Sequence, residues 1–181
     1  MINYKEVSEF KIPSGVNFTL VDGELKASGK LGEARRTFRD NYVRIKLSDG
    51  KIVLEISKES RRNSAIVGTW LSEVKNMAEG VSNGFEYEMK IDYTHFPMRV
   101  SVKGNNVEID NFLGERSPRR AKILGSSKVS IKGDRVFISG IDKRDIGGTA
   151  ANIERATKIK GFDLRVFQDG IYLLKGVEID A

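Results

Sequence analysis

The sequence predicts an α+β fold made of two tandem duplicated domains, each a mainly antiparallel β-sheet packed with one α-helix. Three observations predict it. Segments of the first half return in the same order in the second half, close to 82 positions later. Apolar and polar residues alternate over much of both halves, as they do in half-buried strands. One stretch with the spacing of an amphipathic helix closes the repeated part of each half.

The first repeated element is a hairpin. Residues 16–20 return as residues 98–102, and both segments alternate apolar and polar side chains. Short turns follow at Asp22-Gly23 and at Gly104-Asn105, which suit tight hairpins because these residues tolerate left-handed backbone. The return strands carry Leu25 and Ala27 in the first half and Val107 and Ile109 in the second. Chance matches between two β-rich halves would not keep this order at nearly one offset.

The hairpin is followed by a repeated motif. "LGEARR" at residues 31–36 returns as "LGERSPRR" at residues 113–120. We interpret the motif as a mark of common ancestry at the same place in each sheet. The first copy is expected to be a structural turn, whereas the second begins a basic run.

A strand and a helix complete each repeat. Residues 51–57 match residues 134–139, with a register difference of about one residue in the turn before them. Asn63 and Asp145 are expected to be N-caps, because a short side-chain oxygen can accept an orphan amide of the first turn. Gly80 is expected to end the first helix. The helical stripes are Ile66, Trp70, Val74 and Met77, and Ile146, Ala150, Ile153 and Thr157, with Gly161 beyond the second. The predicted domains are residues 1–82 and 83–181.

Composition excludes several classes of protein. The chain has 181 residues, 39% of them hydrophobic, which suffices for one medium core or two small ones. It has no cysteine, which excludes disulfides and thiolate chemistry and fits a cytosolic protein. No apolar run approaches the ~18 residues of a membrane span, so no membrane partner is expected. Lys and Arg number 31 against 25 Asp and Glu, a net charge of +6 that weakly favours a polyanionic partner.

Catalytic motifs are not evident. HExxH, GxSxG and P-loop patterns are absent, and the acidic residues suggest neither a paired-carboxylate site nor a metal cluster. His95 is the only histidine, and beside Phe96-Pro97 it reads as a structural residue. Gly147-Gly148-Thr149 near a helix start could cradle a phosphate through backbone amides, but without a P-loop lysine pattern the preferred interpretation is close approach of helix and sheet. We therefore predict no catalytic residue, cofactor, metal or small-molecule substrate, and keep an enzyme that uses His95 as a distant alternative.

Basic residues are the strongest sign of function because they cluster. The acid-free run of residues 116–132 carries Arg116, Arg119, Arg120, Lys122, Lys128 and Lys132. A second group is Lys143, Arg144, Arg155, Lys158, Lys160, Arg165 and Lys175. Such side chains on glycine-broken loops can bind phosphates without reading bases, although a solvated face is the alternative for any one of them. Phe162, Phe167 and Tyr172 fit a core as well as a stacking surface, so single-strand binding by stacking is not predicted.

Several motifs together resemble a known family. "GFEYEMKIDYTHFPMRV" (84–100), "NFLGERSPRR" (111–120) and "RVFQDGIYL" (165–173) closely resemble the archaeal and eukaryotic branch of the large-subunit ribosomal protein L6 family. "NMAEGV" (76–81) resembles the end of its first helix, and "GIDKRDIGGTAANI" (140–153) is similar to the start of its second helix in the bacterial branch. The resemblance covers essentially the whole chain.

The resemblance implies a structural protein of the cytoplasmic ribosome with two RNA-recognition-like domains and no catalytic activity. It implies binding to large-subunit, 23S-type rRNA mainly through the second domain, near the region where translational GTPases bind, with neighbouring ribosomal proteins as further partners. The alternative is a protein–protein interaction module that uses its sheet edges and binds no RNA.

The resemblance also implies individual RNA contacts. The family's RNA-facing segment at the second helix corresponds to residues 142–144, and its basic glycine turn to residues 158–161, where Ile159 departs from the bacterial pattern. The expected RNA-binding residues are Lys143, Arg144, Arg155, Lys158, Lys160, Gly161, Arg165, Arg116, Arg119, Arg120 and Lys175.

Overall fold

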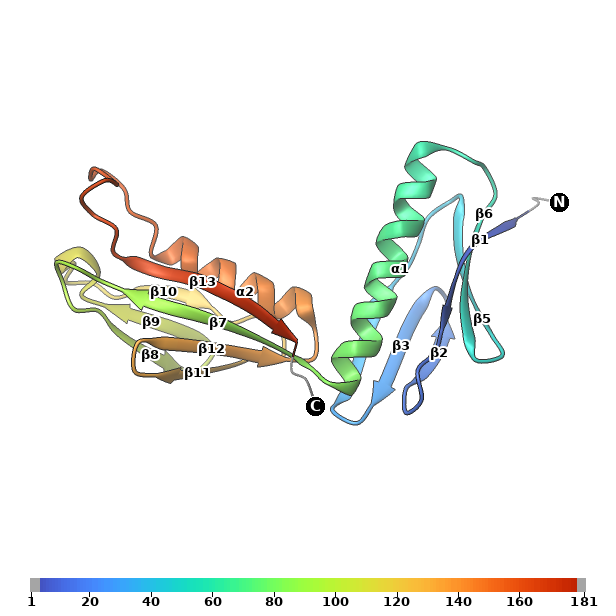
Figure 1. Cartoon of the computed structure of the whole chain (residues 1–181), viewed down its shortest axis with the longest axis horizontal. Helices are drawn as coiled ribbons and strands as arrows, with labels where there is room; N and C mark the ends of the chain where they lie inside the picture. The colour runs from blue at the N-terminus through green and yellow to red at the C-terminus, as the bar shows by residue number, and fades with distance from the viewer. Residues whose placement is uncertain (1–3, 179–181) are drawn as a thin grey trace. The chain divides into compact units, whose positions relative to one another are not determined.

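The computed structural model describes the backbone of residues 4–178 and the side chains of residues 4–174. The chain divides into two compact units, an N-terminal unit, Met1–Asn83, and a C-terminal unit, Gly84–Ala181. Both combine antiparallel strands with one long helix (Figure 1), so the predicted tandem α+β fold is confirmed.

The described part of the N-terminal unit has its strands first and its helix last. In order they are β1 (Lys5–Lys11), β2 (Asn17–Val21), β3 (Glu24–Gly29), β4 (Gly32–Thr37), β5 (Val43–Ser48), β6 (Lys51–Ile56) and α1 (Arg61–Ser82). The strands form two antiparallel sheets, of orders β2-β3-β4 and β1-β6-β5. Helix α1 packs on both sheets. Its buried stripe, Val67, Val74, Met77 and Val81, repeats at helical spacing and removes apolar surface from water.

The C-terminal unit repeats this order and adds a strand. Its elements are β7 (Phe85–Asp92), β8 (Arg99–Lys103), β9 (Asn106–Asp110), the 3-10 turn η1 (Phe112–Gly114), β10 (Arg119–Lys122), β11 (Lys128–Lys132), β12 (Arg135–Gly140), α2 (Lys143–Ala156) and β13 (Gly170–Glu178). The sheets have orders β10-β9-β8 and β11-β12-β7-β13. Helix α2 packs on both, with Ile146, Ala150 and Ile153 facing a core that includes Phe85, Met89 and Ile171.

The predicted offset is exact at three pairs of elements. Strands β2 and β8 span the same length 82 positions apart. Strands β3 and β9 begin 82 positions apart, as do α1 and α2. Both copies of the repeated motif follow the second strand of a three-stranded sheet. The first copy is not mainly a turn, as was expected: only Leu31 lies in the turn, and residues 32–36 belong to β4. In the second copy the η1 turn and Ser117-Pro118 come before β10, so β10 begins later in its repeat than β4 does in the first. Asn111 and Leu113 there have left-handed backbone, with φ values of 60° and 51°.

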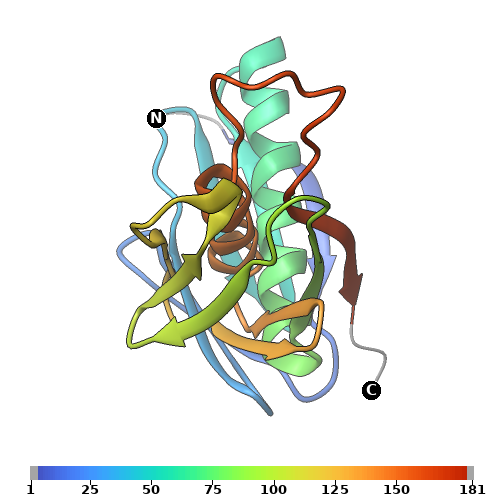
Figure 2. The same ribbon diagram turned by 90° about the vertical axis from the view of Figure 1, so that its left-hand side faces the viewer.

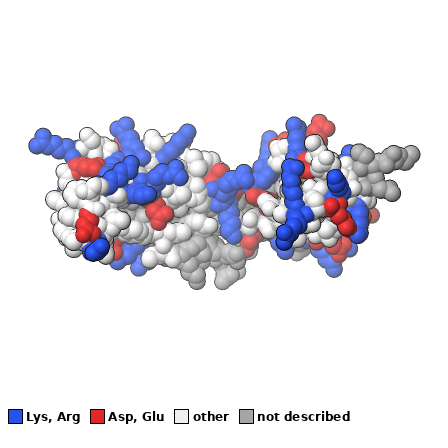
Figure 3. Space-filling view, turned by 90° about the horizontal axis from the view of Figure 1, so that it is seen from above, with Lys and Arg blue, Asp and Glu red and all other residues white. Residues whose placement is uncertain are grey.

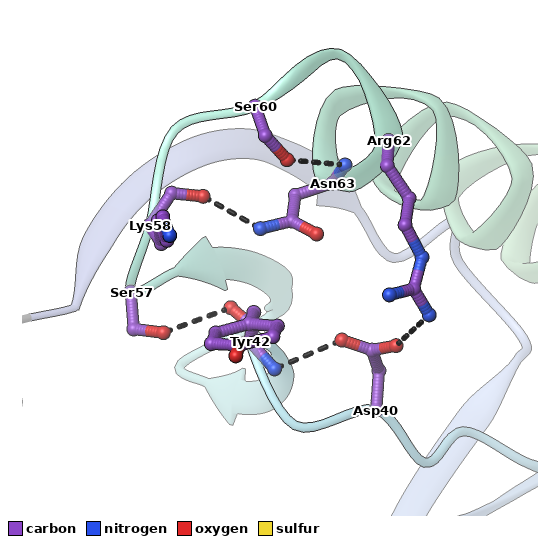
Figure 4. Close-up of polar contacts among 7 residues, drawn as sticks. All are labelled: Asp40, Tyr42, Ser57, Lys58, Ser60, Arg62 and Asn63. Atoms are coloured by element: carbon purple, nitrogen blue, oxygen red, sulfur yellow. Dashed lines mark hydrogen bonds and ion pairs between the residues drawn. The ribbon is translucent and has the colours of Figure 1, made fainter.

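The predicted N-caps are wrong in both helices. Ser60 caps α1, because its Oγ accepts a hydrogen bond from the backbone amide of Asn63 at 3.2 Å (Figure 4). Asn63 is buried in the first turn and donates from Nδ2 to the Lys58 carbonyl at 2.6 Å. Asp142 caps α2 by accepting from the Arg144 amide at 2.9 Å. Each true cap lies three positions before the expected one, where the backbone is still extended.

Three further expectations differ from the structure. Gly80 does not end α1. It is a buried residue of the last turn, and the helix continues to Ser82. Each unit has two separate sheets within the described residues, where one was expected, because alternation reveals strands but not which of them pair. Strand β13 was not predicted. It pairs with β7 along its length, with an irregularity between Leu173 and Lys175.

Candidate nucleic-acid interface

The predicted basic turn lies in a long exposed loop between α2 and β13, residues 157–169, called the α2–β13 loop below. It arches away from the helix and the sheet of its unit (Figure 2). Gly161 has a φ of +79°, a left-handed conformation that glycine adopts without strain. Asp163 shapes the tip, because its carboxylate accepts from the Arg165 amide at 2.9 Å and its carbonyl accepts from the amides of Val166 and Phe167.

Both ends of this loop are fixed by buried polar groups. Thr157 Oγ1 accepts a hydrogen bond from the Ile171 amide at 3.1 Å and lies 3.3 Å from the Ile153 carbonyl, to which it donates. It thereby joins the end of α2 to the start of β13. At the other end Asp169 is fully buried and accepts from the amides of Thr94 and His95. The loop therefore projects from a rigid base.

Asp169 is also an ionised group inside the protein. Burial alone would raise the pKa of its carboxyl group. The hydrogen bonds from the Thr94 amide and from the side chain and amide of His95 outweigh this effect and hold the pKa below its ordinary value. The carboxylate thus stays charged and keeps the segment after β7 attached to the end of the loop.

Arg119 is held within the protein by all of its nitrogens. Nε and Nη2 donate to the two carboxylate oxygens of Glu115, and Nη1 donates to the carbonyls of Ala156 at 2.8 Å and Lys158 at 3.1 Å. The guanidinium lies over the ring of Phe112, 4.2 Å from its centroid. It also holds the pKa of the Glu115 carboxyl below its ordinary value. Arg119 therefore neutralises carbonyl groups at the C-terminal end of α2 and fixes the start of the loop.

Four predicted cations lie together at the end of α2 and in the loop. Arg155, Lys158, Lys160 and Arg165 are all exposed. Within the described residues, no hydrogen bond or ion pair is made by the charged end of any of the four. Figure 3 views the face of the C-terminal unit above α2, where Lys and Arg are more prominent than Asp and Glu. This arrangement is a locally positive surface that phosphates can approach.

The other predicted residues lie elsewhere in the C-terminal unit. Lys143 and Arg144 are at the N-terminal end of α2, roughly 20 Å along a helix of 14 residues from the loop. Lys143 Nζ lies 5.1 Å from the centre of the Phe85 ring. Arg116 is exposed before β10, and Arg120 pairs with the Glu108 carboxylate at 3.0 Å. The side chain of Lys175 lies outside the described residues.

A cavity of about 590 Å³ opens beside the loop, between the last turn of α2 and the start of β13. We call it the loop cavity. Its apolar lining comes from Ala151, Ile159, Leu164, Phe167 and Tyr172, and its polar lining from Glu154, Arg155, Thr157, Lys158 and Gln168. Tyr172 donates its hydroxyl hydrogen to the Gln168 carbonyl at 2.9 Å, and burial raises the pKa of this phenol, which keeps it neutral.

Aromatic and aliphatic loop residues prove to be exposed. Phe162, Leu164 and Val166 are 50%, 63% and 58% exposed, and Tyr172 is 43% exposed. The sequence left open whether Phe162, Phe167 and Tyr172 belong to a core. Of these three, Phe167 is the most covered, and its ring packs against the rings of His95 and Phe162.

His95 has a carboxylate within reach but does not line the loop cavity. Its Nδ1 lies 3.4 Å from Asp169 Oδ1, and its ring is tilted against Phe167. The Asp169 oxygens are occupied by the backbone amides that hold the loop, which is a structural use. Among the side chains of residues 4–174, no group of three or more metal-ligating residues gathers. None of the helices described is long and apolar enough to cross a membrane.

Two buried residues of this site were missed from the sequence. Thr157 was assigned only to the helix stripe, and Asp169 was not singled out. The amides bound by Asp169 are 74 and 75 positions away in the chain, so no local pattern could reveal them.

A duplicated α+β fold with a positively charged loop after its second helix defines a class of small protein suited to a polyanionic partner. The family model described as Ribosomal protein L6 matches residues 12–84 and 96–170, one segment in each unit, and the chain belongs to this family.

Close relatives agree over nearly the full length. The chain is 59% identical over 176 residues to large ribosomal subunit protein uL6 of Picrophilus torridus, covering 97% of this chain and 98% of that protein. It is 56% identical to the uL6 protein of Thermoplasma volcanium, covering 96% and 98%, and 46% identical to that of Methanocella arvoryzae, covering 93% and 96%. These relatives are archaeal ribosomal proteins and not enzymes, and the resemblance found in the sequence is confirmed.

Proposed function

We propose that the protein is a structural constituent of the large subunit of the cytoplasmic ribosome and binds large-subunit rRNA mainly through its C-terminal unit. The observation that carries this proposal is the set of four exposed, unpaired cations at the end of α2 and in the α2–β13 loop. Membership of the ribosomal protein L6 family supports the assembly and the partner. Neighbouring ribosomal proteins and a position near the binding region of translational GTPases are part of the same proposal, supported by the family resemblance.

The predicted contacts fall into three groups in this proposal. The loop group contacts phosphates directly, with Gly161 allowing close approach of the backbone. Lys143, Arg144, Arg116 and Arg120 extend the contact along the unit, with Lys175 on β13. Arg119 contributes by holding the loop, because its donors are already used within the protein.

The test is rRNA binding as a function of salt. Lys158→Ala and Lys160→Ala should each weaken binding and reduce the slope of log K against log salt by about 0.9 per lost phosphate contact. Lys75→Ala is the matched control, since Lys75 is an exposed lysine on α1 in the N-terminal unit and should change neither quantity.

The outcomes separate the alternatives. Unchanged affinity and slope in both loop variants would remove these lysines from the interface. Incorporation into the subunit that resists nuclease and high salt would instead favour a protein–protein module.

A further inference from the structure

The loop cavity has the shape and lining of a binding site that none of the described side chains fills. Its volume of about 590 Å³ lies within the range of small-molecule sites, roughly 300–1,000 Å³. Its area is mainly apolar, and one wall is the largely exposed Leu164. An exposed apolar wall of this kind indicates a partner that removes it from water.

The ring of Tyr172 gives the cavity a flat wall. Its hydroxyl is fixed on the Gln168 carbonyl while 43% of the residue stays exposed. A neutral aromatic face held in one orientation is what a nucleobase stacks on, and such stacking accepts any base because every base has a π-face. Phe167 supplies a second ring in the lining.

The polar residues of the cavity fit the rest of a nucleotide. Arg155 and Lys158 line the cavity, and their charged groups have no partner among the described residues, so both are free to bind a phosphate. Glu154 and Gln168 also line it and can accept hydrogen bonds from exocyclic amino groups. The cavity therefore combines cations with a mainly apolar interior. This combination suits a nucleotide, which has a charged phosphate and a flat base, better than it suits an apolar peptide.

We propose that the loop cavity receives one nucleobase turned out of the bound RNA, stacked on Tyr172 and covered by Leu164, with its phosphate on Arg155 and Lys158. This rests on the proposed function, because it requires RNA at the loop. It adds a stacking contact to an interface that the sequence predicted to be electrostatic only.

The experiment compares two loop variants for binding to large-subunit rRNA over a range of salt concentrations. Leu164→Ala should weaken binding about 3- to 10-fold, part of the roughly 5- to 150-fold that a stacked base contributes, with the salt slope unchanged because no charge is lost. Val166→Ala is the matched control. Val166 is similarly exposed in the same loop but does not line the cavity, so its variant should bind as the wild type does.

A second measurement does not depend on these variants. Ultraviolet crosslinking of the wild-type complex should join a single nucleotide to the peptide that contains Phe167 or Tyr172. Equal binding by the Leu164→Ala protein and the wild type, together with no crosslink at these rings, would overturn the cavity proposal while rRNA binding still stood. Normal rRNA binding with poor subunit incorporation of Leu164→Ala would overturn it too, in favour of a neighbouring protein in the cavity. If the wild type failed to bind rRNA, the proposed function itself would fall.

Discussion

Individual charges in this protein have different uses that the sequence does not distinguish. Arg119 and Arg120 are adjacent members of the same basic run, yet Arg119 bonds to carbonyls at the end of α2 while Arg120 pairs with Glu108 on the neighbouring strand. Clustering of Lys and Arg predicted a positive surface. The clustering could not show that the Arg119 guanidinium already donates to carbonyl groups within the protein, because those carbonyls lie 37 and 39 positions away in the chain.

Replacing Arg119 tests its role in holding the loop. Arg119→Ala should lower the free energy of unfolding of the C-terminal unit by about 1–2 kcal/mol, since hydrogen bonds to partly buried carbonyl groups are lost. It should also speed amide hydrogen exchange in residues 158–168. Binding of rRNA should weaken without a change in salt slope, because the loop cations are held less well in position but the number of phosphate contacts stays the same.

The neighbouring arginine supplies the control. Arg120→Ala leaves Lys103 paired with Glu108 at 2.5 Å, so exchange in the loop should stay as in the wild type. The single tryptophan, Trp70, lies in the N-terminal unit and should report the same unfolding transition in both variants. A reduced salt slope in Arg119→Ala would show that Arg119 contacts phosphate directly.

Secondary-structure elements were predicted well where the pattern was local. The sequence pattern located β2, β8 and both helices, because alternation and helical stripes depend only on nearby residues, but each helix begins three residues earlier than predicted. The caps were misplaced because Ser60 and Asn63, like Asp142 and Asp145, are both good capping residues. Only the path of the preceding chain decides which of two such residues has extended backbone. Strand β13 was missed since its pairing with β7 joins the two ends of the unit.

The cap of α1 can be tested at this scale. Ser60→Ala should lower the stability of the N-terminal unit by about 1 kcal/mol, because the Asn63 amide loses its acceptor. Urea unfolding followed by Trp70 fluorescence measures it. Ser64→Ala, in the exposed first turn, should be neutral or slightly stabilising because alanine favours helix interiors. Equal effects of the two changes would contradict the assignment of Ser60 as the cap.

At the scale of the whole molecule, the duplication explains the fold and the extra strand explains the proposed interface. In the N-terminal unit the chain passes from α1 directly into the next unit, so its helix has no return loop. In the C-terminal unit the chain must travel back from α2 to pair with β7, and the connection is the basic loop. The one repeat that gained a strand therefore also gained the surface proposed for RNA.

The absence of cysteine allows this division of roles to be mapped within the ribosome. A cleavage reagent attached after Lys160→Cys should cut large-subunit rRNA close to the region where translational GTPases bind, because the C-terminal unit, which carries this loop, is proposed to bind rRNA near that region. The same reagent attached after Lys75→Cys, on α1, should give a different and weaker pattern. Identical patterns from the two positions would contradict an interface centred on the C-terminal unit.

The bond between Thr157 and the Ile171 amide has a consequence for how this protein can change through evolution. It closes the base of the α2–β13 loop independently of the residues in between. Insertions, deletions and substitutions at the tip therefore leave the core untouched, as is usual for loops carried on a rigid scaffold. Relatives should tolerate changes at exposed tip positions such as Val166, which neither lines the loop cavity nor carries a proposed phosphate contact, while the threonine and the strand pairing beneath stay the same.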